Sequence, residues 1–232
     1  MLLIAIDGAC RRNGKPDCVS AAGVFIQHFD EYLRLTSTNL LTGHEEHSTN
    51  QRGELLALSL ALSYVLTSKQ SAQIVTDSEY LFNAMTKEWY ITWAHNNWMT
   101  STGSSVKNQD LWSKISGTYA SCVDNGLEIN FYHIKGHCIP FGKVSAAYLL
   151  KQDNTGMQLL SEVMLKYSSV CDTTRKDCLI KANELSERNN GFKLPASKLS
   201  QFVVSNVVVD AIATTCVDNA DMLFNQAAAN GS

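Results

Sequence analysis

Three acidic side chains stand beside predicted strands and a helix, and their type suits metal-assisted chemistry on phosphates. Asp7 closes the apolar run at the N-terminus, Asp77 closes a later apolar run, and Glu54 lies one turn into the helix predicted between them. Ligands of parallel sheets gather beyond the carboxyl ends of the strands, so we expect the two aspartates to converge. Hard oxygen ligands suit Mg²⁺ or Mn²⁺. Each acid alone is more simply explained as a turn residue or a helix-end charge, so context must decide.

The hydrophobic pattern predicts the elements that would position these acids. Apolar spacing from Leu55 to Val65 predicts a helix capped by Thr49 or Asn50, and a strand, helix, strand unit needs a parallel pair with a right-handed crossover. The predicted strands are Leu2–Ile6, Ala22–Phe29, Tyr32–Leu40, Gln73–Thr76 and Leu127–His133. Further helices are predicted over Ser78–Met85, Glu88–Asn96, from about Lys107, and over Ser145–Lys151, Met157–Tyr167, Thr173–Glu187, Lys198–Thr214 and Asp218–Ala229, although valines within 203–209 are equally typical of a strand.

Composition is that of a globular protein with no general attraction to polyanions. The 232 residues are 45% apolar, and the net charge is -3. The seven cysteines form no CxxC pair, which gives little support to a disulfide framework or a zinc site. The first apolar run is too short for a signal peptide or a membrane span. We therefore expect a cytoplasmic, reducing location and no membrane partner.

Five segments occur along the chain in an order that closely resembles type 1 ribonuclease H. The resemblance covers about residues 1–137, and it implies an α/β fold with a five-stranded mixed sheet and helices on both faces. It also implies an endonuclease that hydrolyses the RNA strand of RNA/DNA hybrids with two Mg²⁺ ions, Mn²⁺ being possible, and leaves 5'-phosphate and 3'-hydroxyl ends. The segments are Ile6-Asp7-Gly8-Ala9-Cys10, Thr49-Asn50-Gln51-Arg52-Gly53-Glu54-Leu55, Val75-Thr76-Asp77-Ser78-Glu79-Tyr80, Val106-Lys107-Asn108-Gln109-Asp110-Leu111-Trp112 and His133-Ile134-Lys135-Gly136-His137.

By this resemblance Asp7, Glu54 and Asp77 are metal ligands, and the family's fourth ligand is an aspartate in the last helix. We choose Asp221, because Ala220-Asp221 followed by a leucine and small residues looks like that helix. Asp210 and Asp153 remain alternatives. The choice makes residues 1–137 and 215–232 the catalytic domain and residues 138–214 a mainly helical insertion.

The resemblance also implies a role for the loop histidine and contacts to the substrate. His137 would move a proton or help product release; without the preceding Lys135-Gly136 an exposed loop histidine would be the simpler interpretation. Selecting a hybrid requires sensing the 2'-hydroxyl of one strand and the DNA geometry of the other. The RNA strand would be contacted by Cys10, Asn13 and Gln51, the DNA strand by Thr49, Asn50 and Asn108, and the substrate also by Ser78.

Two regions depart from the family pattern. One segment resembles the substrate-binding handle of bacterial relatives and contains Trp89, Trp93 and Trp98. Such a series of tryptophans is more typical of core packing, and the segment has little positive charge beyond Lys87. Binding through this handle should therefore be weak. The insertion mixes lysines with acids, which favours a solvated helical face, and its protein partner is unknown. Two other functions remain open: a related nuclease that acts on DNA, and an inactive domain that binds a hybrid or a protein partner.

Overall fold

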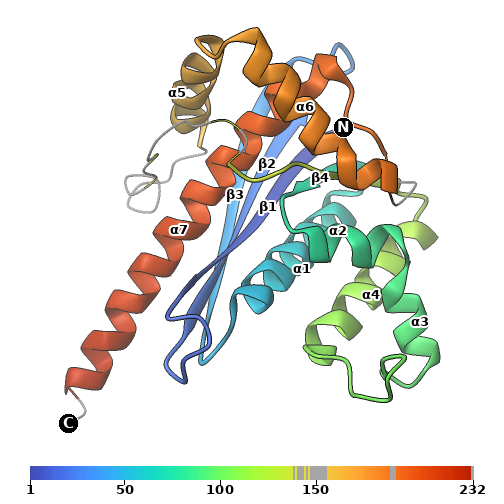
Figure 1. Cartoon of the computed structure of the whole chain (residues 1–232), viewed down its shortest axis with the longest axis vertical. Helices are drawn as coiled ribbons and strands as arrows, with labels where there is room; N and C mark the ends of the chain where they lie inside the picture. The colour runs from blue at the N-terminus through green and yellow to red at the C-terminus, as the bar shows by residue number, and fades with distance from the viewer. Residues whose placement is uncertain (138, 140–143, 145, 147–155, 189–191, 231–232) are drawn as a thin grey trace.

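The computed structural model contains one five-stranded mixed sheet with helices on both faces, as predicted (Figure 1). It describes residues 1–137, 139, 144, 146, 156–188 and 192–230. The strands are β1 (Leu2–Arg11), β2 (Val19–Phe29), β3 (Leu35–Glu46), β4 (Ala72–Thr76) and β5 (Ile129–His133). The helices are α1 (Asn50–Ser68), α2 (Glu79–Thr86), α3 (Trp89–His95), α4 (Gln109–Asp124), α5 (Met157–Ser168), α6 (Asp172–Arg188), the short 3-10 helix η1 (Ala196–Lys198) and α7 (Leu199–Asn230).

The strand order is β3-β2-β1-β4-β5. The first three strands form an antiparallel meander, whereas β4 pairs parallel to β1 and β5 pairs parallel to β4. Helix α1 provides the crossover between β1–β3 and β4, which a parallel pair requires. The carboxyl ends of β1, β4 and β5 therefore lead toward the same side of the molecule.

Alternate residues of β1 face two separate cores. Ile4 and Ile6 pack with α1, α2 and α4 on one face, and Leu3 and Ala5 pack with α5, α6 and α7 on the other. All four side chains are buried, which explains why this strand is a continuous apolar run in the sequence. The insertion thus covers a face of the sheet.

Helix α7 is the main cover of that second face. Its residues Phe202, Val204, Val208 and Ile212 are fully buried. By length and composition its Ala196–Leu223 stretch is apolar enough to cross a membrane, but 67% of the most apolar window is buried inside the protein. Burial against the sheet accounts for the apolar sequence, as for any core helix.

Several predicted boundaries differ from the structure. The third strand begins at Leu35 because Asp30 accepts hydrogen bonds from the backbone amides of Tyr32 and Arg34 in a turn. The two helices predicted over 198–214 and 218–229 are one continuous helix, so the predicted domain boundary at 214/215 falls inside α7. The helix predicted over 145–151 lies outside the described residues.

Free thiols predominate among the described cysteines. Cys10, Cys18, Cys122, Cys171 and Cys216 are free, and Cys178 in α6 is disulfide-bonded.

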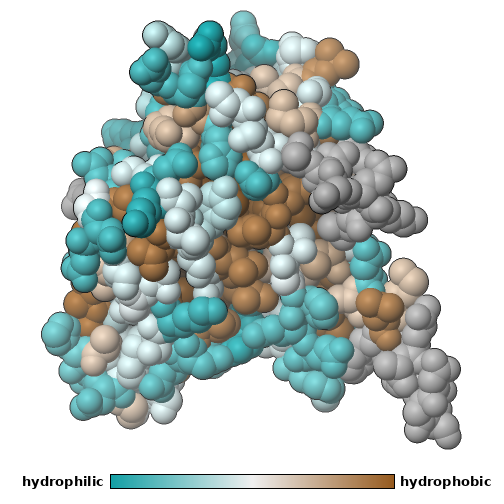
Figure 2. Space-filling view, turned by 180° about the vertical axis from the view of Figure 1, so that it is seen from behind, coloured by the Kyte–Doolittle hydropathy of each residue, from teal (hydrophilic) through white to brown (hydrophobic). Residues whose placement is uncertain are grey.

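Viewed from behind, the molecule shows an apolar area near its centre that polar side chains surround (Figure 2).

Candidate active site

Asp7 lies in the middle of β1, just past the point where the parallel neighbour stops. The strand continues to Arg11, but the pairing of β1 with β4 ends at Ala5 and Val75. Asp7 therefore remains at the end of the parallel pair even though it does not end its strand. The backbone amide of Gly8 donates to Asp7 Oδ1 at 2.8 Å. A side chain on Gly8 would collide with the backbone of Glu54, so the glycine lets α1 approach the strand closely.

Glu54 is held in the first turns of α1 by two polar neighbours. Asn50 donates its Nδ2 to Glu54 Oε1 at 3.1 Å, and the hydroxyl of Ser78 donates to Glu54 Oε2. Burial raises the pKa of Glu54 to about 7, Asp77 adds to the rise, and the Ser78 hydrogen bond opposes it. The carboxylate is therefore oriented by side chains but poorly solvated.

Asp77 follows β4 directly and lies against the loop that leaves β5. Its Oδ2 accepts a hydrogen bond from Asn206 Nδ2 at 3.4 Å. A Cβ atom on Gly136 would overlap Asp77 Oδ2, so only glycine leaves room for the carboxylate there. Burial raises the pKa of Asp77, and Asp210 adds to the rise, whereas Asn206 and His137 lower it.

The acid that α7 contributes to this group is Asp210. Burial raises the pKa of Asp7 well above its usual value, and the charges of Asp77, Asp210 and Glu54 raise it further. Asn206 and Asp210 lie one turn apart on α7, so they present side chains to the same side of the helix. The sequence offered Asp210 only as an alternative to Asp221 and gave Asn206 no role, although their four-residue spacing was a usable signal.

Asp221, the expected fourth ligand, lies elsewhere on the same helix. It is eleven residues beyond Asp210, which corresponds to about 16 Å along a straight helix. Its Oδ1 forms an ion pair with Arg12 at 2.5 Å, close to the ion pair that Arg11 forms with Asp218 at 2.6 Å. The continuous α7 therefore does not bring Asp221 together with Asp7, Glu54 and Asp77, while the alternative Asp153 lies outside the described residues.

The four carboxylates line a site rather than enclose a finished coordination shell. Within the described ranges, no three Asp, Glu, His or Cys side chains are grouped tightly enough to hold an ion as they stand. Their mutual repulsion and oxygen-only chemistry nevertheless fit a hard divalent cation, which relieves like charge. Mg²⁺ in particular uses one or two carboxylates and completes its shell with water and substrate phosphate.

The predicted substrate residues divide into exposed and supporting groups. Asn13, Thr49, Gln51 and His137 are exposed. Cys10 and Asn108 are partly buried, and burial and the neighbouring Cys18 raise the pKa of the Cys10 thiol to about 12. Ser78 is buried and Asn50 partly buried, and the side chains of both bind Glu54, so they position a carboxylate.

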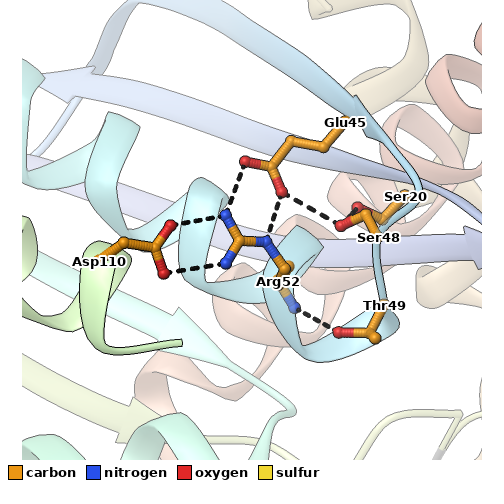
Figure 3. Close-up of polar contacts among 6 residues, drawn as sticks. All are labelled: Ser20, Glu45, Ser48, Thr49, Arg52 and Asp110. Atoms are coloured by element: carbon orange, nitrogen blue, oxygen red, sulfur yellow. Dashed lines mark hydrogen bonds and ion pairs between the residues drawn. The ribbon is translucent and has the colours of Figure 1, made fainter. Parts of the chain in front are cut away.

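The side chain of Arg52 links three elements of the structure (Figure 3). Its guanidinium donates to Glu45 at 2.8 and 3.2 Å and to both carboxylate oxygens of Asp110 at 2.9 and 2.8 Å. The backbone amide of Arg52 also donates to Thr49 Oγ1, which caps α1. These contacts join β3, α1 and α4. The role of Arg52 was not predicted from the sequence, because Asp110 lies 58 residues further along the chain.

The tryptophans of the handle segment pack inward, as their composition indicated. Trp93 contacts the fully buried Trp112 with ring centroids 5.4 Å apart, and Trp89 contacts Trp93 at 6.0 Å. Lys87 Nζ lies 5.8 Å from the centre of the Trp89 ring. This segment therefore offers a hydrophobic contact to α4 and little positive charge.

Comparison with known proteins settles the family. The family model described as RNase H matches residues 1–145, which is more than half of the chain. The chain belongs to the ribonuclease H family. It is therefore a nuclease of the hydrolase class, and family membership implies cleavage of the RNA strand in RNA/DNA hybrids.

Individual members of the ribonuclease H family show how far the likeness extends. Ribonuclease H of Clostridium botulinum is 31% identical over 136 residues, which covers 59% of this chain and 83% of the relative. Ribonuclease H of Rickettsia canadensis is 34% identical over 163 residues, which covers 70% of this chain and 93% of the relative. The solved structure of LC9-RNase H1, a type 1 RNase H with the type 2 active-site motif, is 22% identical with a TM-score of 0.50 and covers 59% of this chain and 63% of that one. That structure supports the fold alone.

Proposed function

We propose that this chain is an endonuclease that cuts the RNA strand of RNA/DNA hybrids at two divalent ions held by Asp7, Glu54, Asp77 and Asp210. The observation that carries the proposal is the position of these carboxylates, which two strands and two helices bring from distant parts of the chain to the end of the parallel strand pair. The products would have 5'-phosphate and 3'-hydroxyl ends. Mg²⁺ is the expected ion, and Mn²⁺ would substitute.

The side chains would share the work of binding and orientation. Bound divalent ions would lower the pKa of an attacking water and stabilise the leaving oxygen. Asp7 and Asp77 would hold the ions beside the scissile phosphate, with Asn206 fixing the direction of Asp77. Asn50 and Ser78 would orient Glu54.

His137 would serve as the proton carrier. It is exposed on the loop beside Asp77, whose pKa it lowers by its charge. Its exposure beside Asp77 suits it to exchange a proton with solvent during product release. Gly136 lets this loop approach Asp77.

Two variants on one helix test the assignment. Asp210→Asn should lose more activity on a labelled hybrid than the roughly 10- to 100-fold typical of mutating a residue that only orients a metal ligand, because it removes a ligand itself. Asp221→Asn should keep near-parental activity, since its carboxylate binds Arg12. Retained cleavage by Asp210→Asn with loss in Asp221→Asn would overturn the ligand set.

The substrate and the metal need a separate assay. Parent protein should cut the hybrid, leave duplex DNA and duplex RNA intact, and stop when EDTA is added. Preferential cutting of duplex DNA would indicate a related DNA nuclease instead, and binding without cutting would indicate an inactive domain. Cleavage that continues after complete metal removal would contradict the mechanism.

A further inference from the structure

A cavity of about 290 Å³ opens directly beside Asp77, between the loop that follows β5 and the insertion helix α6. The cavity is therefore lined both by Asp77, a proposed metal ligand, and by α6, which lies outside the part of the chain that matches the family. Helix α6 packs on β5, and Figure 1 shows it passing above α2, whereas α3 of the handle lies at the lower right. The lining residues are Asp77, Glu79, His133, Lys135, Gly136, Lys181, Glu184, Leu185 and Arg188.

Three cations of this wall are exposed and uncommitted. Lys135, Lys181 and Arg188 are all exposed, and in the described part of the chain none of them has an acidic partner within 4.0 Å. Glu184 lies three residues after Lys181 and four before Arg188, the spacing at which helix ion pairs form. Because neither ion pair is formed, Glu184 does not neutralise the positive charges of α6 that line the cavity.

His133, one of the residues that line the cavity, is 9% exposed. Among the described residues no group lies within hydrogen-bonding geometry of its buried Nδ1 atom. Buried polar atoms are nearly always paired, with protein, water or a ligand. The cavity lining therefore combines exposed positive charge with a buried polar side chain, which is a combination that suits an oxyanion.

We propose that this cavity binds a phosphodiester group of the RNA strand next to the scissile one, with Lys181 and Arg188 of α6 as its principal contacts. The inference rests on the proposed function, because Asp77 places the cleaved strand at the mouth of the cavity. Positive charge that the handle lacks is thereby supplied by the insertion. A divalent ion at Asp77 would offset that carboxylate, which leaves the lysines and Arg188 to face the phosphate.

The test measures the salt dependence of hybrid binding. Affinity for a short labelled hybrid is measured in Mg²⁺ at several salt concentrations, with Asp210→Asn as the background that prevents cutting. Each phosphate contact contributes a slope of roughly 0.9 in a plot of log affinity against log salt for a duplex. Because the two cations contact one phosphate, the added pair Lys181→Ala and Arg188→Ala should flatten the slope by roughly 0.9 and weaken binding at low salt.

Matched variants separate a local contact from general charge. Lys166→Ala with Lys176→Ala removes the same charge from the insertion outside the cavity and should leave the slope unchanged. Lys181→Arg with Arg188→Lys keeps the charge and should keep the slope. Equal flattening by the Lys166 and Lys176 pair, or an unchanged slope in the Lys181 and Arg188 pair, would overturn the proposal.

A second comparison assigns the strand. An uncharged methylphosphonate beside the cleavage position of the RNA strand should weaken binding by the parent but not by the Lys181 and Arg188 variant. If the same modification in the DNA strand produced that pattern instead, the assignment would be wrong. A parent chain that neither binds nor cuts the hybrid would remove the proposed function as well, whereas normal cutting with an unchanged slope would remove this inference alone.

Discussion

Glu54, Asp7 and Asp77 are partly withdrawn from water, and all three have a pKa above the usual value for a carboxylic acid. Burial is the first cause in each case, and the neighbouring acids add to it. A folded state that binds a proton more tightly than the unfolded chain becomes less stable as pH rises. The negative charge of these carboxylates therefore lowers the stability of the folded state, and a bound cation would offset this loss.

The first prediction concerns pH and metal removal. For Glu54 the folded pKa is about 7 against a reference of 4.5, so the folded state is favoured below the reference value and loses that advantage as pH rises toward 7. In EDTA the free energy of unfolding should fall by roughly 3 kcal/mol from this group between pH 4.5 and 7. Urea titrations at several pH values measure it.

Two further measurements control that prediction. Glu54→Gln should flatten the pH dependence, and Mg²⁺ should raise stability at pH 8 more than at pH 5, because only charged ligands attract the ion. Metal-free protein that is equally stable at pH 5 and pH 8 would contradict the description of these acids as strained.

A second residue-scale prediction concerns the space beside Asp77. Gly136→Ala should displace the Asp77 carboxylate and reduce the rate of cleavage about 10- to 100-fold, as does the loss of a residue that orients a metal ligand. Gly117→Ala is the control, because a methyl group there meets no atom within 4 Å in α4 and should stabilise the helix by about 0.5–1 kcal/mol. Activity assays with melting curves compare the two. Full activity in Gly136→Ala would refute the steric argument.

At the scale of elements, β1 and α7 show what the sequence can and cannot predict. The apolar run from Leu2 to Ile6 needs no tertiary information, because a strand buried on both faces has few other solutions. The choice between Asp210 and Asp221 does need it. Ala220-Asp221 matches a local pattern, whereas the site selects the acid by its distance along a continuous helix. The valines before Asp210 were ambiguous for the same reason, since buried helices and strands have similar compositions.

Arg52 provides the prediction at this scale. Arg52→Ala should cost about 1–2 kcal/mol of stability, because it leaves Glu45 and the more exposed Asp110 without their fork-shaped partner. It should also raise KM for the hybrid more than it lowers kcat, since Thr49 and Asn108 lie on the elements it joins. Arg52→Lys should recover only part of both effects. A purely thermal effect with an unchanged KM would limit Arg52 to a structural role.

At the scale of the whole molecule, helix α7 is part of the core. Phe202 of α7 is fully buried and contacts Tyr132 of β5 with ring centroids 5.0 Å apart. Phe202→Ala should therefore lower the free energy of unfolding by about 3–5 kcal/mol. Leu165→Ala, on a side chain that is 75% exposed in α5, should change it by less than about 0.5 kcal/mol. Chemical denaturation of both variants measures the difference, and similar losses would show that the insertion does not pack as described.

The single helix that runs from Leu199 to Asn230 brings one acid to the catalytic centre and also carries the packing surface of the insertion. Turning a helix by one residue swings its side chains by about 100°. A drug or an evolved change that shifts the docking of α5 against this rod would swing Asp210 away from its partners without touching the centre itself. Apolar residues on the far face of the sheet, where α5 packs on α7, therefore help to set the position of Asp210.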